Sequence, residues 1–211
     1  ANCRQEGDRQ DLGNGLLALS FMVKWVRSDN DEAPFERSHN LALEALSVFR
    51  ELDDKRGIMR ALRDAAPFAG SQTIAMLEES LALAKDLGEI LDAAQSLAAL
   101  ARHYALVDPA NGISLNLEAL ALFREVDSPA GIARCCLSLS IGGASSVDKR
   151  RYAVEAAQNF RRAGDPRHAA MATTVAAMNC DTDFELLELE PELQLGLIDA
   201  HEVGNTVQLA G

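Results

Sequence analysis

The sequence has few aromatic residues and no strand-like pattern. Phe, Trp and Tyr together make up 5% of the 211 residues, whereas the hydrophobic class as a whole makes up 48%, with Ala and Leu dominant. Ala and Leu favour helices. Alternating runs of Val, Ile and Thr, which mark strands, are absent. These features predict an all-α protein.

Cysteine is scarce, and long apolar runs are missing. The four cysteines are Cys3, Cys135, Cys136 and Cys180. Adjacent cysteines on a helix cannot form an ordinary disulfide, and no C-x-x-C pair offers a zinc site. We therefore expect small, buried thiols in a reducing cytosol. No apolar run reaches the roughly 18 residues of a membrane span, and residues 1–8 lack the apolar core of a signal peptide, so we expect a cytoplasmic location and no membrane partner.

Positive charge is also in deficit. The chain has 20 Lys and Arg against 32 Asp and Glu, which gives a net charge of −12 and a pI near 4.7. Nucleic-acid binding needs a basic footprint, so we expect no nucleic-acid partner. The acidic balance is better suited to keeping an extended surface soluble.

Catalytic and metal-binding motifs are missing as well. The histidines are widely spaced, and no H-E-x-x-H occurs. The acidic turn at 181–183 lacks the glycine and the terminal glutamate of a calcium loop, and Gly142-Gly143 is not followed by the Lys-Ser/Thr of a phosphate loop. We expect no catalytic residues, no metal, no cofactor and no enzyme activity.

What the sequence does contain is a repeated helix–turn–helix pattern. Its clearest copy is 117–134, where one predicted helix ends at Val126, turns at Asp127 and restarts at Pro129. Equivalent turn positions recur at spacings of 46, 35, 39, 37 and 40 residues. They are Gly7, Asp53, Gly88, Asp127, Gly164 and Gly204. Periods in this range indicate a solenoid of two-helix repeats.

Residues at fixed distances from these turns are chemically alike. Three residues before the turn stands a cation, which suits the negative end of a helix dipole: Arg50, Lys85, Arg124 and Arg161. Eight residues before it stands a small residue: Ala45, Ser80, Ala119, Ala156 and Gly196. Small positions beside large ones allow neighbouring helices to pack closely.

The pattern resembles tetratricopeptide repeats, in the longer version found in bacterial transcriptional regulators and signalling ATPases. In that family a helix ends roughly as E-S-L-A-L-F-R-E-L-G-D, and the next begins as R-R-G-I-A. Segments 79–83 and 119–127 match the first half, and 56–58 and 131–133 match the second. The family's aromatic residue at the start of the first helix is absent. The resemblance implies a right-handed α-solenoid of about five antiparallel helix hairpins.

One repeat domain then covers 1–211. Its five units are 8–52, 53–87, 88–126, 127–163 and 164–203. With Gly7 and Gly204 as turns, the chain opens in the tail of a second helix and closes inside a new first helix. This is the pattern expected of a fragment cut from a longer array.

Several local signals refine the helix bounds. We expect a polar loop at 27–35, a cap at Ser38 or Asn40 on the helix that follows it, and a helix end or kink at Pro67. Pro129 suits the first position of a helix. The acidic stretch 185–191, interrupted by proline, predicts a short or broken helix before the last helix.

In the resembled family, the first helix of each hairpin lines a concave groove. Carrying its groove positions over gives Asn14, Leu17, Phe21, Arg60, Arg63, Gln95, Arg102, Arg134, Leu137, Ile141 and Met178. Arginine binds carboxylates bidentately, so the four arginines favour an acidic peptide or a chain terminus as ligand. The other interpretation is that they pair with Asp or Glu on neighbouring helices and contribute little to stability.

The expected function is a protein–protein interaction scaffold, a regulatory or signalling module that holds a peptide or helix of a partner in this groove. Two alternatives stay open. One is a ligand-sensing regulatory domain of a bacterial transcriptional regulator or signalling ATPase, which the resemblance implies. The other is a self-associating repeat protein, because repeat arrays without capping ends tend to associate.

Overall fold

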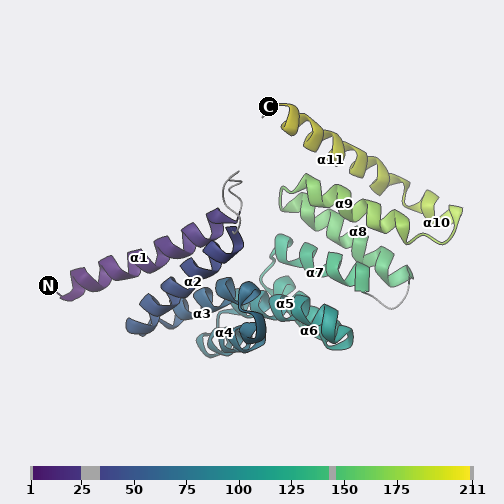
Figure 1. The fold of residues 1–211 in the computed structure, drawn as a ribbon. Helices are drawn as coiled ribbons and strands as arrows, with labels where there is room; N and C mark the ends of the chain where they lie inside the picture. The colour runs from purple at the N-terminus through teal and green to yellow at the C-terminus, as the bar shows by residue number, and fades with distance from the viewer. Residues whose placement is uncertain (1, 25–33, 143–145, 210–211) are drawn as a thin grey trace. The chain divides into compact units, whose positions relative to one another are not determined.

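The computed structural model describes residues 2–24, 34–142 and 146–209, with side chains for 7–24, 34–142 and 146–204. These residues form eleven α-helices and two short 3-10 helices, and no strand occurs among them (Figure 1). The prediction of an all-α protein is confirmed. None of the described helices combines the length and the apolar character needed to cross a membrane.

The chain divides into two compact units, Ala1–Leu100 and Ala101–Gly211, here called unit 1 and unit 2. The boundary falls inside helix α5 (Ile90–Val107). Each unit is described by itself.

Unit 1 is built from successive antiparallel helices. Before α5 it contains α1 (Asn2–Val23), α2 (Pro34–Glu51), α3 (Lys55–Ala65) and α4 (Thr73–Leu87). Helix α2 packs against α1 and α3, α3 packs against α4, and α1 also contacts α3. Two 3-10 helices, Ala66–Phe68 and Gly70–Gln72, connect α3 to α4.

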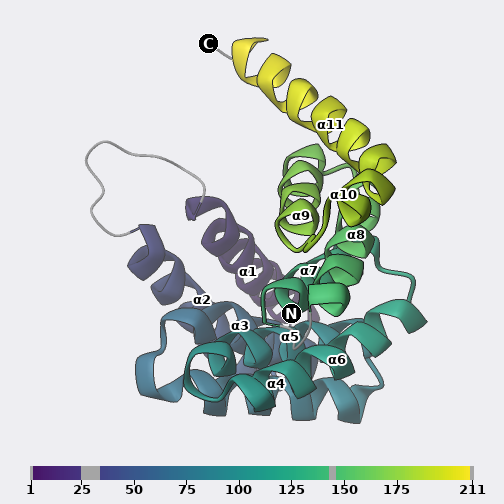
Figure 2. The same cartoon turned by 90° about the vertical axis from the view of Figure 1, so that its right-hand side faces the viewer.

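Unit 2 continues the alternation. After the end of α5 come α6 (Pro109–Glu125), α7 (Pro129–Gly142), α8 (Ser146–Arg162), α9 (Pro166–Met178), α10 (Asp183–Glu188) and α11 (Glu190–Leu209). Helix α7 packs against α6 and α8 and contacts α9, which lies between α8 and α11 (Figure 1). Figure 2 shows the short α10 at the foot of the long α11. A short helix before the last one was expected from the acidic, proline-interrupted sequence.

Four of the predicted turns share one backbone geometry. Asp53, Gly88, Asp127 and Gly164 have φ values of 53°, 70°, 43° and 72°. In each turn the N–H of the following residue donates to the carbonyl four residues before the turn, as in Asp54 N to Phe49 O at 3.0 Å and Ser128 N to Phe123 O at 2.9 Å. This is the Schellman arrangement that ends helices in a left-handed residue. Aspartate tolerates that conformation better than most side chains, so it replaces glycine twice.

The outer two predicted turns are wrong. Gly7 lies inside α1 and Gly204 lies inside α11, and neither has a positive φ. An isolated glycine weakens a helix but does not end it. Each of the four internal turns also has a buried Phe or Ala four residues before it. Gly204 lacks this feature, because Ala200 is exposed, and Gly7 is preceded at that distance by a cysteine.

Other local predictions have mixed outcomes. Helix α7 starts at Pro129 as predicted, and α3 gives way to a 3-10 helix that contains Pro67. The predicted cap at Ser38 or Asn40 is wrong, because α2 already begins at Pro34 and Ser38 is buried in its interior. Trp25, Val26, most of the predicted loop and the side chain of Cys3 lie outside the described residues.

The core follows the repeat positions. The small residues eight before each turn are all buried, and Gly196 shares this position although Gly204 is not a turn. Phe49 and Phe123, four residues before their turns, pack against Gly57 and Gly131 of the next helix. A Cβ at Gly131 would lie 2.2 Å from Phe123 Cδ1, so glycine is required there. Helix α4 has the smaller Ala84 at the position of Phe49 and Phe123, and α5 then has Asp92 at the position of Gly57 and Gly131.

Candidate binding surface on the first helices

In unit 1 the predicted groove arginines are occupied by neighbouring side chains. Arg63 Nη1 on α3 donates to Asp92 Oδ1 on α5 at 2.5 Å, and both side chains are largely buried. Arg60 Nη2 donates to Asn14 Oδ1 on α1 at 3.2 Å. Here the structure shows pairing between neighbouring helices.

The same region carries a carboxyl group in an unfavourable environment. Asp64 lies beside Arg63 on α3, and burial raises the pKa of its carboxyl above the ordinary value. The charges of Arg63, Lys24 and Arg60 act in the opposite direction but do not offset the loss of hydration. On this surface of unit 1, Arg63 and Arg60 thus interact with side chains of the protein itself.

In unit 2 the predicted arginines have different surroundings. Arg102 on α5 and Arg134 on α7 are exposed, and neither forms a hydrogen bond or ion pair with a carboxylate among the described residues. Loss of hydration lowers the pKa of Arg102, and the nearby positive charge of Arg134 lowers it further. Two like charges within interaction range, without a counter-ion, form a local attraction for anions.

Two cysteine thiols lie on α7, and one of them, Cys135, is within electrostatic range of this arginine pair. Cys135 and Cys136 on α7 are buried and free. Burial raises the pKa of Cys135 to about 12, in spite of the lowering effect of Arg134 and Arg102, and burial likewise raises the pKa of Cys136. A thiol that stays protonated is a poor nucleophile and metal ligand. Cys180 is half-buried, so the expectation of burial holds fully for two of the three thiols that the structure describes.

The apolar groove residues divide in the same way. In unit 2, Ile141 on α7 and Met178 on α9 are 68% and 79% exposed, and Leu137 is half-buried. In unit 1, Leu17 is buried and Gln95 half-buried, so of the predicted groove residues there only Asn14 and Phe21 are well exposed. Unit 2 thus presents exposed apolar side chains together with its arginine pair.

A small cavity opens in unit 2 between α5, α6 and α7. It is lined mostly by small residues, among them Ala101, Ala105, Gly112, Asn116 and Ser138. Its one buried amide is already used, because Asn116 Nδ2 donates to Cys135 O at 3.2 Å. Among the described residues, no group of three or more His, Cys, Asp or Glu side chains is placed to hold a metal ion.

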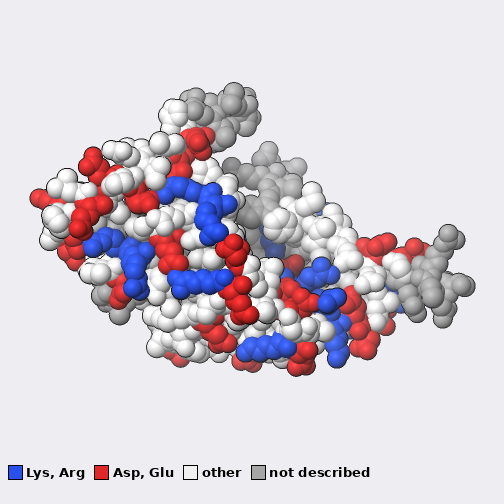
Figure 3. Space-filling model, turned by 180° about the vertical axis from the view of Figure 1, so that it is seen from behind, with Lys and Arg blue, Asp and Glu red and all other residues white. Residues whose placement is uncertain are grey.

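The cations three residues before each turn have a role that the sequence did not indicate. Arg50, Arg124 and Arg161 reach the second helix of the next hairpin. Arg50 pairs with Glu79, and Arg124 pairs with Glu155 at 2.5 Å. The glutamate partners stand nine residues before their own turns, a second regularity from which the pairing could have been predicted. On the face drawn in Figure 3, acidic and basic side chains alternate instead of gathering into a patch of one sign.

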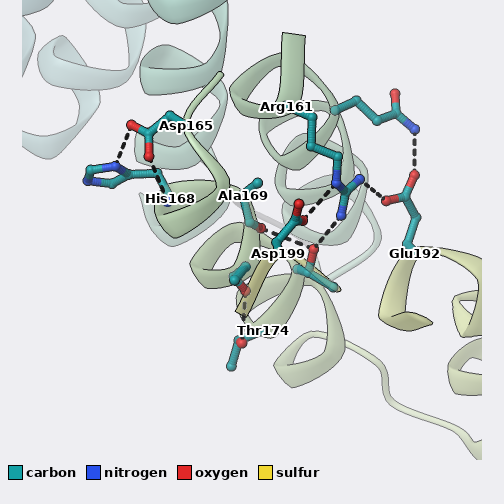
Figure 4. Close-up of polar contacts among 10 residues, drawn as sticks. Arg161, Asp165, His168, Ala169, Thr174, Glu192 and Asp199 are labelled. Carbon is teal, nitrogen blue, oxygen red and sulfur yellow. Dashed lines mark hydrogen bonds and ion pairs between the residues drawn. The ribbon is translucent and has the colours of Figure 1, made fainter. Parts of the chain in front are cut away.

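The last of these pairs is the most buried. Arg161 on α8 lies between two carboxylates of α11, with Glu192 Oε2 at 2.6 Å from Nη1 and Asp199 Oδ2 at 2.8 Å from Nε (Figure 4). Its Nη2 also donates to the hydroxyl of Thr173 on α9. Burial opposes the charge of Arg161, but the hydrogen bonds to Glu192 and Asp199 outweigh it and raise its pKa. This cluster attaches α11 to the rest of unit 2.

Comparison with known proteins adds no family to this description: neither a protein-family model nor a curated protein matches the chain.

Proposed function

We propose that the chain is a tetratricopeptide-like α-solenoid that binds a peptide or helix of a partner protein on the first helices of its hairpins. The internal turns share one geometry, and first helices contact one another within each unit, as α1 does with α3 and α7 with α9. Both features fit stacked hairpins with the first helices on one side. Free thiols in the described part of the chain fit a reducing, cytosolic setting.

The observation that carries this proposal is that Arg102 and Arg134 of unit 2 have no carboxylate partner among the described residues. Arg102 and Arg134 combine exposed guanidinium groups with mutual repulsion, and the exposed Ile141 and Met178 belong to the same predicted inner face. A carboxylate bound here relieves the repulsion, and flanking apolar groups of the ligand cover the aliphatic side chains. The ligand favoured by this chemistry is an acidic peptide with apolar residues between its carboxylates.

A selection from a random peptide library, displayed on phage, tests the proposal. Selected peptides should be rich in Asp or Glu alternating with apolar residues. Their affinity for Arg102→Ala/Arg134→Ala should fall at least about tenfold, since one charge-assisted hydrogen bond contributes about 1.5–3 kcal/mol. Arg102→Lys/Arg134→Lys should bind with intermediate affinity, because lysine keeps the charge but not the bidentate geometry.

The matched control is Arg124→Ala, which removes an exposed arginine that is already paired with Glu155. Its peptide affinity should equal that of the wild type. Peptides without acidic residues, or equal binding to the wild type and the Arg102/Arg134 variant, would contradict the proposal.

A small-molecule sensor is the second candidate, and the cavity between α5, α6 and α7 is the feature that favours it. The rim of this cavity includes Pro109, Ile113 and Leu139, so a small apolar ligand fits its chemistry. A ligand that raises the melting temperature of the wild type but not of Ser138→Phe, which fills the cavity, would support this function. If no compound shows that difference, the sensor proposal fails.

A further inference from the structure

The first helix of the chain exposes positions that are buried in every later first helix. Leu19 on α1 is 51% exposed. The residues at the equivalent repeat position of α3, α5, α7 and α9 are between 0% and 3% exposed: Ala65, Leu100, Leu139 and Ala176. Gly15, one turn earlier on α1, is likewise exposed, whereas its equivalents Ala61, Ser96, Cys135 and Ala172 are buried.

The last helix shows the mirror image of this difference. Leu197 on α11 is 72% exposed. Its equivalents on α2, α6 and α8 are at most 4% exposed, and the one on α4 is half-buried: Leu46, Leu120, Ala157 and Leu81. Ala200 is also exposed, at the position that Phe49, Ala84, Phe123 and Phe160 hold in the core.

The junctions inside the units show what normally covers these positions. Phe49 of α2 packs against Gly57 of α3, Phe123 of α6 against Gly131 of α7, and Phe160 of α8 stacks on His168 of α9 with ring centroids 5.2 Å apart. The outer face of a second helix is therefore covered by the first helix of the next hairpin. The outer face of α11 carries Leu197 and Ala200, both exposed, and α1 has the face that would cover it.

The packed side of α11 is fixed on α9, because Gly196 lies so close to Thr173 that a Cβ would approach its Cγ2 to 2.7 Å. Leu197 and Ala200 lie three residues apart, on one side of the helix, and both are exposed.

We propose that α11 of one molecule packs against α1 of a second copy of this chain, forming one more junction of the kind that joins its own hairpins. A second copy is the occupant that the repeat positions select, because α11 and α1 carry the two complementary halves of the junction and the described residues of both halves are exposed. The contact is heterologous, so each added copy leaves one free α1 and one free α11. Growth is end to end and depends on concentration. This inference is independent of the proposed peptide site.

Sedimentation velocity over a wide range of protein concentration tests it with two variants. Leu19→Glu disables the α1 face, and Leu197→Glu disables the α11 face. Both side chains are exposed, so folding should be retained, as circular dichroism will verify. The wild type should show a mass that rises beyond the dimer with concentration, and each variant alone should stay monomeric.

Mixing the two variants gives the decisive measurement. The Leu19→Glu copy still has a working α11, and the Leu197→Glu copy still has a working α1, so the mixture should form a dimer of one copy of each and grow no further. Leu106→Glu alters a residue that is 91% exposed on α5 and should associate like the wild type.

Three outcomes overturn the inference. A wild type that stays monomeric at every concentration shows that another kind of segment covers these faces. If either variant still associates with itself, the contact joins two α1 helices or two α11 helices and is symmetric. Two monomeric variants that fail to combine show that α1 and α11 do not contact each other.

Discussion

Units 1 and 2 each carry two arginines at predicted groove positions, and the two pairs have opposite surroundings. In unit 1, Arg63 is held by Asp92 and Arg60 by Asn14. In unit 2, Arg102 and Arg134 repel each other and have no carboxylate partner among the described residues. Arginines at predicted groove positions thus connect neighbouring helices in unit 1 and lack a carboxylate partner among the described residues in unit 2.

Packing explains part of this difference. Asp92 occupies the repeat position that Gly131 occupies in unit 2. Phe123 lies against Gly131 and leaves no room for a side chain there, whereas the corresponding residue before Asp92 is Ala84. The carboxylate that pairs with Arg63 in unit 1 therefore has no counterpart at Gly131 in unit 2.

The largest expected effect concerns the packing that both units share. Phe49→Ala and Phe123→Ala should each lower the free energy of unfolding by about 3–5 kcal/mol, because each ring is fully buried. Denaturant unfolding measures the loss. Gly131→Ala should destabilise the wild type but not the Phe123→Ala variant, since the added methyl group then enters vacated space. Equal costs in both backgrounds would show that these two residues are not coupled.

The second prediction compares one repeat position in the two units. Arg161→Met in unit 2 should cost about 2–3 kcal/mol, because it leaves the buried Asp199 carboxylate without its partner. Arg50→Met in unit 1 removes an exposed pair with Glu79 and should cost at most about 1 kcal/mol. Thermal unfolding of the two variants gives the ranking. Hydrogen exchange should show that the Arg161→Met variant loses protection mainly in α11. Equal losses of unfolding free energy in the two variants would contradict the distinction drawn from burial.

A smaller effect separates the two arginine pairs directly. Arg63→Met should lower the free energy of unfolding by about 1–2 kcal/mol, through loss of a short, largely buried hydrogen bond to Asp92. Arg102→Met should stay within about 0.5 kcal/mol of the wild type, as is usual for a surface change away from such contacts. Denaturant midpoints at a fixed salt concentration measure both. A costly Arg102→Met would mean that this arginine supports the fold.

The smallest effect depends on pH and concerns unit 1. The pKa of Asp64 is raised in the folded protein by burial, so its ionised form destabilises the fold at neutral pH. That penalty is present above the folded pKa and vanishes below the unfolded pKa. Asp64→Asn should therefore raise the melting temperature at neutral pH, and the gain should fade as the pH falls. The exposed Asp86→Asn serves as control, and a gain that persists in acid would contradict this explanation.

Prediction from sequence succeeded where the signal is local. The turns at Asp53, Gly88, Asp127 and Gly164 depend on a residue that tolerates positive φ together with a buried residue four positions earlier, and both are visible in the repeat. It failed at Gly7, Gly204 and Ser38, where a single residue type was taken as a stop or a cap. A residue type suggests a boundary, but the boundary also needs the hydrogen bonds of its neighbours.

By itself, the sequence determined the helical character of this protein, its internal period and the small and large positions of its core, because these depend on helix propensity and on spacing along one helix. Only the tertiary structure decided which arginines are paired and which apolar residues of the terminal helices stay uncovered. Those outcomes depend on side chains about 30 to 40 residues apart in the chain, whose contacts follow from how tightly consecutive helices approach. That approach is set by pairs such as Phe123 and Gly131.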